Sequence, residues 1–167
     1  MKKIGLLSDT HGSIPEKAFE FFSPCQEIWH AGDIGNTAVL DALEAFRPVK
    51  AVFGNIDGTE IRARTPEIIT QTIEGVKMSM IHIGGYPGKY QPKALEIIRK
   101  EQPKVFISGH SHILKVIYDK KHNLLHINPG AAGKSGLHQK ITMVRFDLGN
   151  GEIKNLEVFE KDRKSMA

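Results

Sequence analysis

The sequence predicts a single α/β domain in which mixed β-sheets are covered by helices. In the first half, short β-branched and aliphatic runs alternate with helical patterns, which favours parallel strands joined by crossover helices. In the second half, the polar stretch 119–123 and the Asn150-Gly151 pair separate strand-like runs and predict antiparallel hairpins. Because 167 residues are ordinary for one domain, we expect residues 1–160 to form it and residues 161–167 to fray.

Runs rich in β-branched and aliphatic residues predict the strands. In chain order they span residues 3–7, 27–30, 50–53, 68–73, 77–81, 104–107, 114–118, 124–127, 141–146 and 153–159. Three helical patterns lie among the earlier runs. Ser13 can cap the first helix and Asn36 the second, while the third begins at Pro92 and ends before Pro103.

Composition argues against several classes of protein. No apolar run approaches the roughly 20 residues that span a bilayer, so we expect no membrane association. The single cysteine, Cys25, cannot form an internal disulfide, which favours a reducing, cytoplasmic location. Lys and Arg number 23 and Asp and Glu 19, but no basic stripe with interleaved aromatic residues appears, so nucleic acid is not an expected partner. The eight histidines are an unusually large number for this length.

Many of the expected strands are followed by side chains that can bind a metal ion. Because the carboxyl ends of parallel strands share one edge of a sheet, side chains distant in sequence can converge there on one pocket. The candidate metal ligands are Asp9, His11, Asp33, Asn55, His82, His110 and His112.

The residue types indicate which metals this pocket would bind. Oxygen donors combined with imidazole nitrogen suit Mn, Fe, Zn, Ni or Co, whereas an all-oxygen set would favour Mg or Ca. Seven ligands exceed one tetrahedral site but suit two divalent ions about 3.5 to 4 Å apart that share a carboxylate. In Asp-x-His and His-x-His, alternate side chains of an extended segment share one side. The glycines before Asp33, Asn55 and His110 let the backbone turn sharply near the ions.

Five short motifs follow one another in the order expected of a known family. They are Asp9-Thr10-His11, Gly32-Asp33, Gly54-Asn55, His82 with a nearby glycine, and Gly109-His110-Ser111-His112, followed by the turn Asn128-Pro129-Gly130. The set resembles that of the calcineurin-like metallophosphoesterases, in particular the small bacterial and archaeal phosphodiesterase-type members. Up to that turn the similarity covers essentially the whole chain. It implies a four-layer αββα sandwich with two mixed sheets.

The resemblance also implies a division of the ligands and a reaction. The implied ligands are Asp9, His11, Asp33 and His112 for one ion, and Asp33, Asn55, His82 and His110 for the other. Asp33 would bridge two divalent ions, with manganese first among the candidates, and a bridging hydroxide would attack phosphorus. Asp33, Asn55 and His110 would be the catalytic residues. The expected substrates are phosphodiesters or small phosphorylated molecules.

One position departs from the family pattern in a way that affects the leaving group. Many members carry a histidine directly after the motif asparagine, whereas this chain has Ile56, which can neither donate a proton nor stabilise charge. Expulsion of a poor alkoxide should be slow unless water, a metal or another side chain assists. We therefore expect a preference for aryl phosphoesters, which comparable rates on alkyl and aryl diesters would contradict.

Other residues are candidates for supporting roles. His138 and Lys134 lie in a small-residue loop that could cover the pocket and bind substrate, or could simply be flexible. His30 could orient Asp33 through a hydrogen bond or have a buried structural role, and Asp57 is a second candidate for such support.

A second class of protein shares the implied fold. Because some proteins of this fold serve mainly as protein-interaction scaffolds, the alternative is a metal-binding scaffold with little or no turnover. Scaffolds can lose metal histidines, whereas all seven candidate ligands are present here, which favours an enzyme. Exposed hairpin strands could also support a homodimer. Of the other histidines, His122 fits a solvated turn and His126 fits strand packing.

Overall fold

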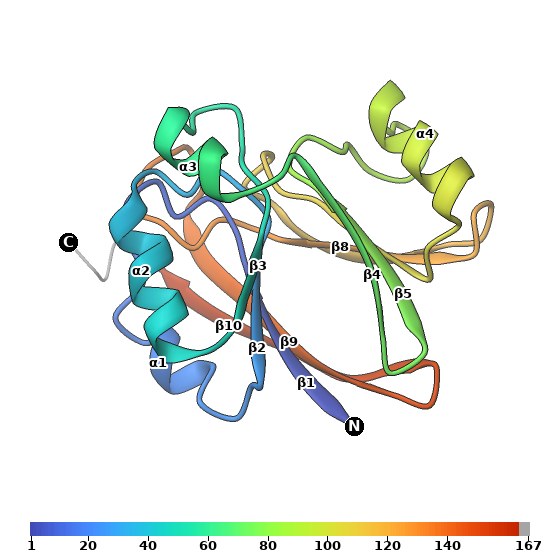
Figure 1. The fold of residues 1–167 in the computed structure, drawn as a ribbon, viewed down its shortest axis with the longest axis horizontal. Coiled ribbons are helices and arrows are strands. Elements are labelled where there is room, and N and C mark those ends of the chain that lie inside the picture. Colours follow the sequence, from blue (N-terminus) through green and yellow to red (C-terminus); the bar gives the residue numbers. More distant parts are fainter. Residues whose placement is uncertain (164–167) are drawn as a thin grey trace.

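The computed structural model describes residues 1–163, which form two stacked five-stranded sheets with helices on both outer faces (Figure 1). The strands of the first sheet, in spatial order, are β10 (Glu152–Asp162), β9 (Lys140–Gly149), β1 (Lys2–Leu7), β2 (Glu27–His30) and β3 (Val49–Ala51). Those of the second are β4 (Ile68–Ile73), β5 (Val76–Ile81), β6 (Val105–Ile107), β8 (Leu124–Pro129) and β7 (Leu114–Asp119). This confirms the expected four-layer αββα sandwich.

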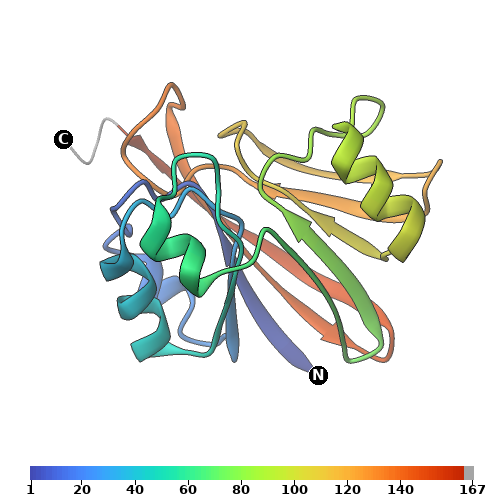
Figure 2. The ribbon, with the colours of Figure 1, turned by 45° about the horizontal axis from the view of Figure 1, so that its top comes forward.

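Both sheets are mixed, as the alternation of strand and helix predicts. In the first sheet β1, β2 and β3 run parallel, β9 pairs antiparallel with β1, and β10 pairs antiparallel with β9. In the second, β5, β6 and β8 run parallel between the antiparallel edge strands β4 and β7. The exits of the parallel strands from both sheets meet at one edge of the sandwich (Figure 2).

The helices agree with the sequence in part. The side chain of Asn36 accepts a hydrogen bond from Val39 N–H and caps α2 (Thr37–Phe46), as expected, and α4 (Pro92–Glu101) begins at its proline. The predicted cap at Ser13 is wrong. Its N–H instead closes a tight turn onto the Thr10 carbonyl, and α1 (Ala18–Phe21) begins only after a second turn. A short helix, α3 (Thr59–Arg64), was not predicted.

The predicted hairpins are present in the second half of the chain. Asn150 and Gly151 have φ angles of 51° and 76° between β9 and β10, and positive φ at both central residues is what a tight hairpin turn of this kind requires. Strand β10 continues to Asp162, which pairs with Lys140, so the expected frayed tail does not begin at residue 161. Residues 164–167 of that expected tail lie outside the described part of the chain.

Three apolar cores hold the layers together. The largest lies between the two sheets and includes Trp29, Met78 and Phe146, while smaller ones join α1 and α2 to the first sheet and α4 to the second.

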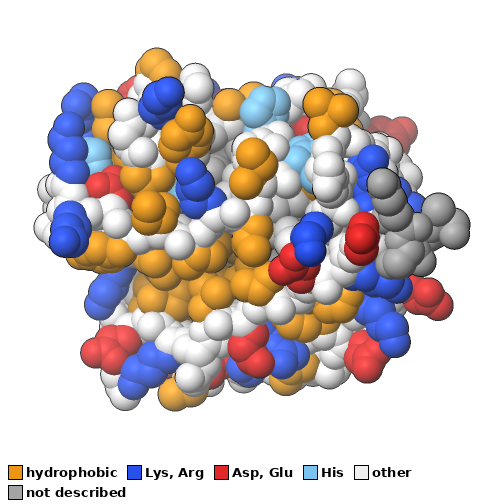
Figure 3. All heavy atoms as spheres, turned by 180° about the vertical axis from the view of Figure 1, so that it is seen from behind, with side chains coloured by type: hydrophobic (Ala, Val, Ile, Leu, Met, Phe, Trp, Pro, Cys, Tyr) orange, Lys and Arg blue, Asp and Glu red, His pale blue; other side chains and the backbone are white. Residues whose placement is uncertain are grey.

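On the outside, β7 leaves Val116 and Ile117 exposed, and Figure 3 shows hydrophobic side chains gathered in a band across one face. The homodimer stays a prediction. Within residues 1–163, no helix is long and apolar enough to cross a membrane.

Candidate metal centre

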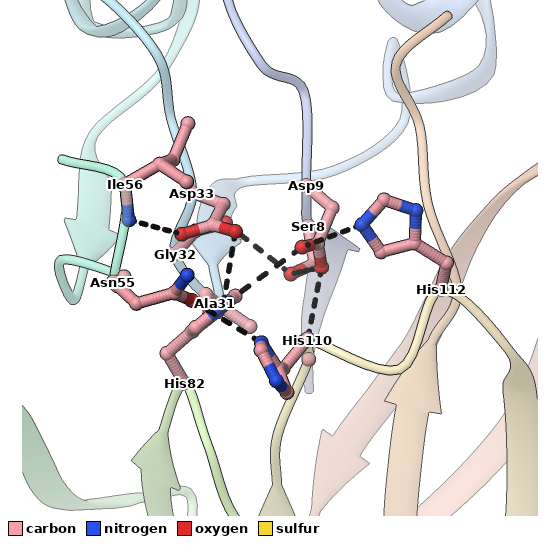
Figure 4. Close-up of polar contacts among 12 residues, drawn as sticks. Ser8, Asp9, Ala31, Gly32, Asp33, Asn55, Ile56, His82, His110 and His112 are labelled. Atoms are coloured by element: carbon pink, nitrogen blue, oxygen red, sulfur yellow. Dashed lines mark hydrogen bonds and ion pairs between the residues drawn. The ribbon is translucent and has the colours of Figure 1, made fainter. Parts of the chain in front are cut away.

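The strand exits bring all seven predicted side chains into one cluster, in which two groups of possible metal ligands can be distinguished (Figure 4). Site 1 consists of Asp9, His11 and His112, and site 2 consists of Asp33, His82 and His110. Within each group the ligand atoms lie within 4.8 Å of one another. Asn55 joins site 2, because its Oδ1 lies 3.2 Å from Nδ1 of His110.

Asp33 lies between the two sites. Its Oδ2 is 3.5 Å from Nε2 of His11 in site 1 and 3.3 Å from Nε2 of His82 in site 2. Asp9 is more one-sided, since its Oδ1 is 3.2 Å from Nε2 of His112 and 3.8 Å from Nε2 of His82. A carboxylate placed like Asp33 can contact a cation in either group.

Several atoms that face one another in this cluster have no hydrogen-bond partner. Among the described residues, these buried atoms are Oδ1 of Asp9, Nε2 of His11 and Nε2 of His82. Buried polar atoms are nearly always hydrogen-bonded, because leaving one unpaired costs roughly 1 to 3 kcal/mol. A group of lone pairs pointing at a common space is what bound cations would satisfy, so these residues fit divalent metal ions.

The charges of the cluster also shift the pKa of its members. Burial raises the pKa of Asp9, but His112, His82 and Ser8 outweigh it and hold that pKa below its usual value. Burial lowers the pKa of His82, but the carboxylates of Asp33 and Asp9 outweigh it and hold that pKa above its usual value. Burial raises the pKa of Asp33, but His82 and the Ile56 N–H outweigh it, so both carboxylates are ionised at neutral pH and offer negative charge to a cation.

Neighbouring groups determine which atom of each ligand faces the centre. Ser8 Oγ donates to Oδ2 of Asp9 at 2.6 Å, which leaves Oδ1 directed inward. The N–H of Ile56 similarly occupies Oδ1 of Asp33, at 3.1 Å, and leaves Oδ2 free of it. Nδ1 of His82 donates to the Ala31 carbonyl at 2.7 Å, and because a carbonyl only accepts, the neutral ring that binds a metal has its lone pair on Nε2.

The backbone of the ligand residues is not extended, contrary to the expectation from the Asp-x-His and His-x-His spacing. Left-handed φ angles, between 47° and 74°, occur at Asp9, His11, Asp33, His110 and His112. Residues other than glycine adopt such angles at a cost of order 1 to 3 kcal/mol, and they concentrate at functional sites. The chain thus reaches the centre through left-handed turns at the strand exits rather than through an alternating strand.

The predicted glycines are required mainly by close approach. A Cβ on Gly54 would lie 2.1 Å from Oδ1 of Asp33, and one on Gly109 would lie 2.2 Å from Oγ of Ser8. Only Gly32, with φ of 102°, also makes the left-handed turn that was expected. At positions 54 and 109 the missing side chain makes room for a ligand residue of a neighbouring strand.

His30 and Asp57 support the backbone of the site rather than its side chains. Gly32 N–H donates to Nδ1 of His30, whose Nε2–H donates to the Thr10 hydroxyl. Burial lowers the pKa of His30 to about 4, so the ring is neutral at pH 7. Asp57 accepts hydrogen bonds from the N–H groups of residues 34, 35 and 54, which fixes the loops that carry Asp33 and Asn55.

The two residues expected to bind substrate differ in environment. Lys134 is exposed on the loop that follows β8. His138 is only 9% exposed, and its ring contacts His112 and the Gly133 carbonyl.

His122, expected to be solvated, is half-buried and contacts the Asp119 carboxylate at 2.9 Å, so that expectation is wrong.

The sequence reasoning missed the roles of Ser8 and Arg62. Ser8 directly precedes Asp9, and this adjacency was the available signal. Arg62 lies on the unpredicted α3, where its guanidinium is 4.3 Å from the Phe53 ring centroid and donates to the Asp57 carbonyl.

Two hollows flank the cluster. The first has a volume of about 450 Å³, and its lining residues include Phe53, Asn55, Arg62, His82 and Ile83. The second has a volume of about 500 Å³ and is lined by residues that include His110, His112, Ile113, Leu137 and His138. Each hollow is of a size that holds a small organic group.

Known proteins resemble this chain in sequence. The sequence profile of the calcineurin-like phosphoesterase superfamily domain matches residues 1–151. A probable metallophosphoesterase of Methanothermobacter thermautotrophicus is 32% identical over 133 residues, covering 77% of this chain and 76% of that protein.

Solved structures share the fold along almost the whole chain. An archaeal phosphodiesterase is 25% identical, with a TM-score of 0.75 over 94% of this chain and 99% of that one. Chaetomium thermophilum Vps29 is 18% identical, with a TM-score of 0.75 over 96% of this chain and 97% of that one, a likeness that shows the fold alone.

Proposed function

Because the chain belongs to the calcineurin-like phosphoesterase superfamily, we propose that it is a phosphohydrolase that uses two divalent cations to cleave phosphodiesters. The observation that carries the proposal is the group of unpartnered buried atoms on Asp9, His11 and His82, gathered around the Asp33 carboxylate. Manganese is the first candidate, and Fe, Ni, Zn or Co suit the same oxygen and imidazole donors.

The residues around the two cations have distinct roles. Asp9, His11 and His112 would hold one ion, and Asn55, His82 and His110 the other, with Asp33 shared between them. When bound, two divalent ions would supply a positive potential for phosphate and would lower the pKa of water towards neutrality, so that water could serve as the nucleophile. The two carboxylates offset only part of that charge.

The protein holds the two ligand carboxylates in position before any substrate binds. Hydrogen bonds from Ser8 and from the Ile56 N–H fix the carboxylates of Asp9 and Asp33, so the groups need little rearrangement during the reaction. Asn55 and His110 are exposed on the side of the first and second hollows respectively, where a phosphate would enter.

The two hollows support a diester rather than a monoester. A phosphodiester carries two organic groups, and the cluster has one hollow beside Asn55 and His82 and another beside His110 and His112. The first contains the apolar side chains Phe53 and Ile83 together with the cation Arg62. An aryl group in the first hollow would contact apolar walls, and Arg62 would place positive charge near the phosphate.

The leaving group determines which diesters react. Ile56 is 48% exposed beside Asn55 and offers no acid, so a good leaving group that departs without protonation is favoured. We therefore expect aryl diesters to react faster than alkyl diesters, and Ile56→His to raise the alkyl rate more than the aryl rate. Equal rates on both classes in the wild type would contradict this part of the proposal.

The experiment measures hydrolysis of bis(p-nitrophenyl) phosphate, p-nitrophenyl phosphate and an alkyl diester by protein loaded with Mn²⁺. We expect the aryl diester to be the best substrate and Asp33→Asn to abolish its hydrolysis, with exposed Asp41→Asn as the matched control. A stable wild-type protein with no bound metal and no turnover would contradict the proposal and favour a scaffold. Faster hydrolysis of the monoester would overturn the preference for diesters.

A further inference from the structure

The buried ring of His138 makes two contacts that point to a role in the metal centre. Its Nε2 lies 2.8 Å from the Gly133 carbonyl oxygen, and its Nδ1 lies 3.0 Å from Nδ1 of His112. The ring is nearly inaccessible to solvent, and the ring centroids of His112 and His138 are 4.9 Å apart in an edge-on arrangement. The pair therefore forms a fixed connection between site 1 and the loop that follows β8.

These contacts determine where the protons are. The Gly133 carbonyl can only accept, so His138 carries its proton on Nε2. The two Nδ1 atoms lie at hydrogen-bond distance, so one must donate and the other accept, and a His138 ring that carries its proton on Nε2 has its lone pair on Nδ1. Nδ1 of His112 must then donate to it, which leaves the lone pair of His112 on Nε2. That atom lies 3.2 Å from Oδ1 of Asp9, on the side of site 1.

The backbone on which His138 depends is attached to the same strand exit as Asp9. Gly133 N–H donates to the Asp9 carbonyl at 3.1 Å, and Ala132 N–H donates to the Ser8 carbonyl at 2.8 Å. A Cβ on Gly133 would lie 2.2 Å from the Thr10 carbonyl oxygen, so the loop presses directly on this exit. The contacts form a closed ring from the Asp9 backbone through Gly133, His138 and His112 to the Asp9 carboxylate.

A second glycine keeps this ring of contacts possible. Gly136 has φ of 130°, and a Cβ there would lie 2.4 Å from Nδ1 of His112 and 3.0 Å from Nδ1 of His138. The loop can therefore pass over the histidine pair only without a side chain at position 136.

We propose that His138 is a positioning residue that holds His112 as an Nε2 ligand and so sets the affinity of site 1 for its cation. The inference rests on the proposed two-cation centre. Site 2 uses a different support, since the backbone carbonyl of Ala31 orients His82. Loss of His138 should therefore weaken one cation and leave the other. Removal of such a supporting group typically lowers metal affinity about 10- to 100-fold.

The test measures Mn²⁺ binding to metal-free protein by titration calorimetry and by electron paramagnetic resonance. His138→Leu should lower the affinity for one of two ions by about 10- to 100-fold. His138→Gln should restore most of it, because its amide can donate to Gly133 and accept from His112. His126→Leu, a buried histidine outside both sites, is the matched control and should change neither affinity.

Several outcomes would overturn the inference. They are unchanged binding in His138→Leu, equal weakening of both ions, and a glutamine variant as weak as the leucine variant. To assign the affected ion, His138→Leu is combined with His112→Ala, and the double variant should bind no worse than His112→Ala alone. Binding is read without turnover, so two bound ions in an inactive wild type would contradict the proposed function and leave this inference standing.

A backbone variant gives an independent check if His138→Leu fails to fold. Gly136→Ala should weaken the same ion, because its Cβ would strike His112. Gly88→Ala is the control, since Gly88 also has positive φ, 88°, but nothing lies within 4 Å of its added Cβ. Equal effects of the two alanines would attribute the change to backbone strain and contradict the proposed contact.

Discussion

Site 1 and site 2 have similar ligands but are supported in different ways. In site 1, each ligand has a side-chain support, since Ser8 donates to Asp9 alongside the N–H of His110, and His138 contacts His112. In site 2, the backbone holds side chains, since the N–H of residue 56 donates to Asp33 and the carbonyl of residue 31 accepts from His82. A side-chain support can be removed by one substitution, whereas a backbone support can be disturbed only by changing the path of the chain.

The largest effect is expected at Asp33, because this residue is shared by the two sites. Its carboxylate faces His11 of site 1 and His82 of site 2, so Asp33→Asn removes negative charge from both. We expect loss of both bound ions, measured as metal content after dialysis, and a fall in diester hydrolysis beyond the roughly 100-fold that supporting residues cause. Retention of two tightly bound ions would show that Asp33 is not shared.

The backbone support of site 2 should fail when the chain path is blocked. Gly54→Ala places a Cβ 2.1 Å from Oδ1 of Asp33, which must displace that carboxylate from the Ile56 N–H. Because Asp33 is shared, we expect weaker binding of both ions together with a marked fall in the free energy of unfolding, measured by urea denaturation with and without Mn²⁺. Gly58→Ala, with nothing within 4 Å of the added Cβ, is the control. Similar results for the two alanines would contradict the close-packing argument.

Removal of a side-chain support in site 1 should have a smaller effect on cation binding. Ser8→Ala removes a hydrogen bond to the ionised Asp9, which is worth roughly 1.5 to 3 kcal/mol, so the affinity of site 1 should fall about tenfold or more. Ser108→Ala is the matched control, because Ser108 is equally buried and its hydroxyl has no partner among the described residues. Calorimetric titration with Mn²⁺ distinguishes them. A larger loss at site 2 than at site 1 would contradict the assignment of supports.

The metal ligands could be predicted from the sequence, but the groups that hold them in position could not. The order of strands and the residues at their exits predicted the sandwich and the cluster, because parallel strand ends share one edge. The turn at Ser13 and the helix α3 were not predicted, since six residues of helix leave little periodicity to detect.

The supports depend on contacts between distant segments. Residue 138 reaches His112 only because Gly133 bonds the exit of β1, and no local pattern in residues 131–138 specifies that contact. The extended backbone inferred from Asp-x-His was wrong for a similar reason. The left-handed turns at residues 9, 11 and 110 are held by tertiary hydrogen bonds from their N–H groups, which outweigh the local preference.

The smallest effect at neutral pH is expected for a buried histidine outside both sites. Burial lowers the pKa of His126 to about 4, against 6.5 for an ordinary histidine. Below pH 6.5 the unfolded chain binds a proton that the folded ring accepts only near pH 4. As the pH is lowered from 6.5 to 4, this group should therefore reduce the free energy of unfolding by up to about 1.4 kcal/mol per pH unit.

Urea denaturation across this range, compared with His126→Leu, isolates that contribution. The wild type should lose stability more steeply than the variant from pH 6.5 to 4, and the two should run parallel between pH 7 and 8. Parallel curves over the whole range would show that His126 is not held neutral by burial.

The most direct test concerns the two cations, one in each site. Anomalous diffraction from crystals soaked in Mn²⁺ tests this without any assay of activity. We predict one peak beside Asp9, His11 and His112, a second beside Asn55, His82 and His110, and a separation of about 3.5 to 4 Å across Asp33. A single peak, or two peaks that do not share Asp33, would contradict the account.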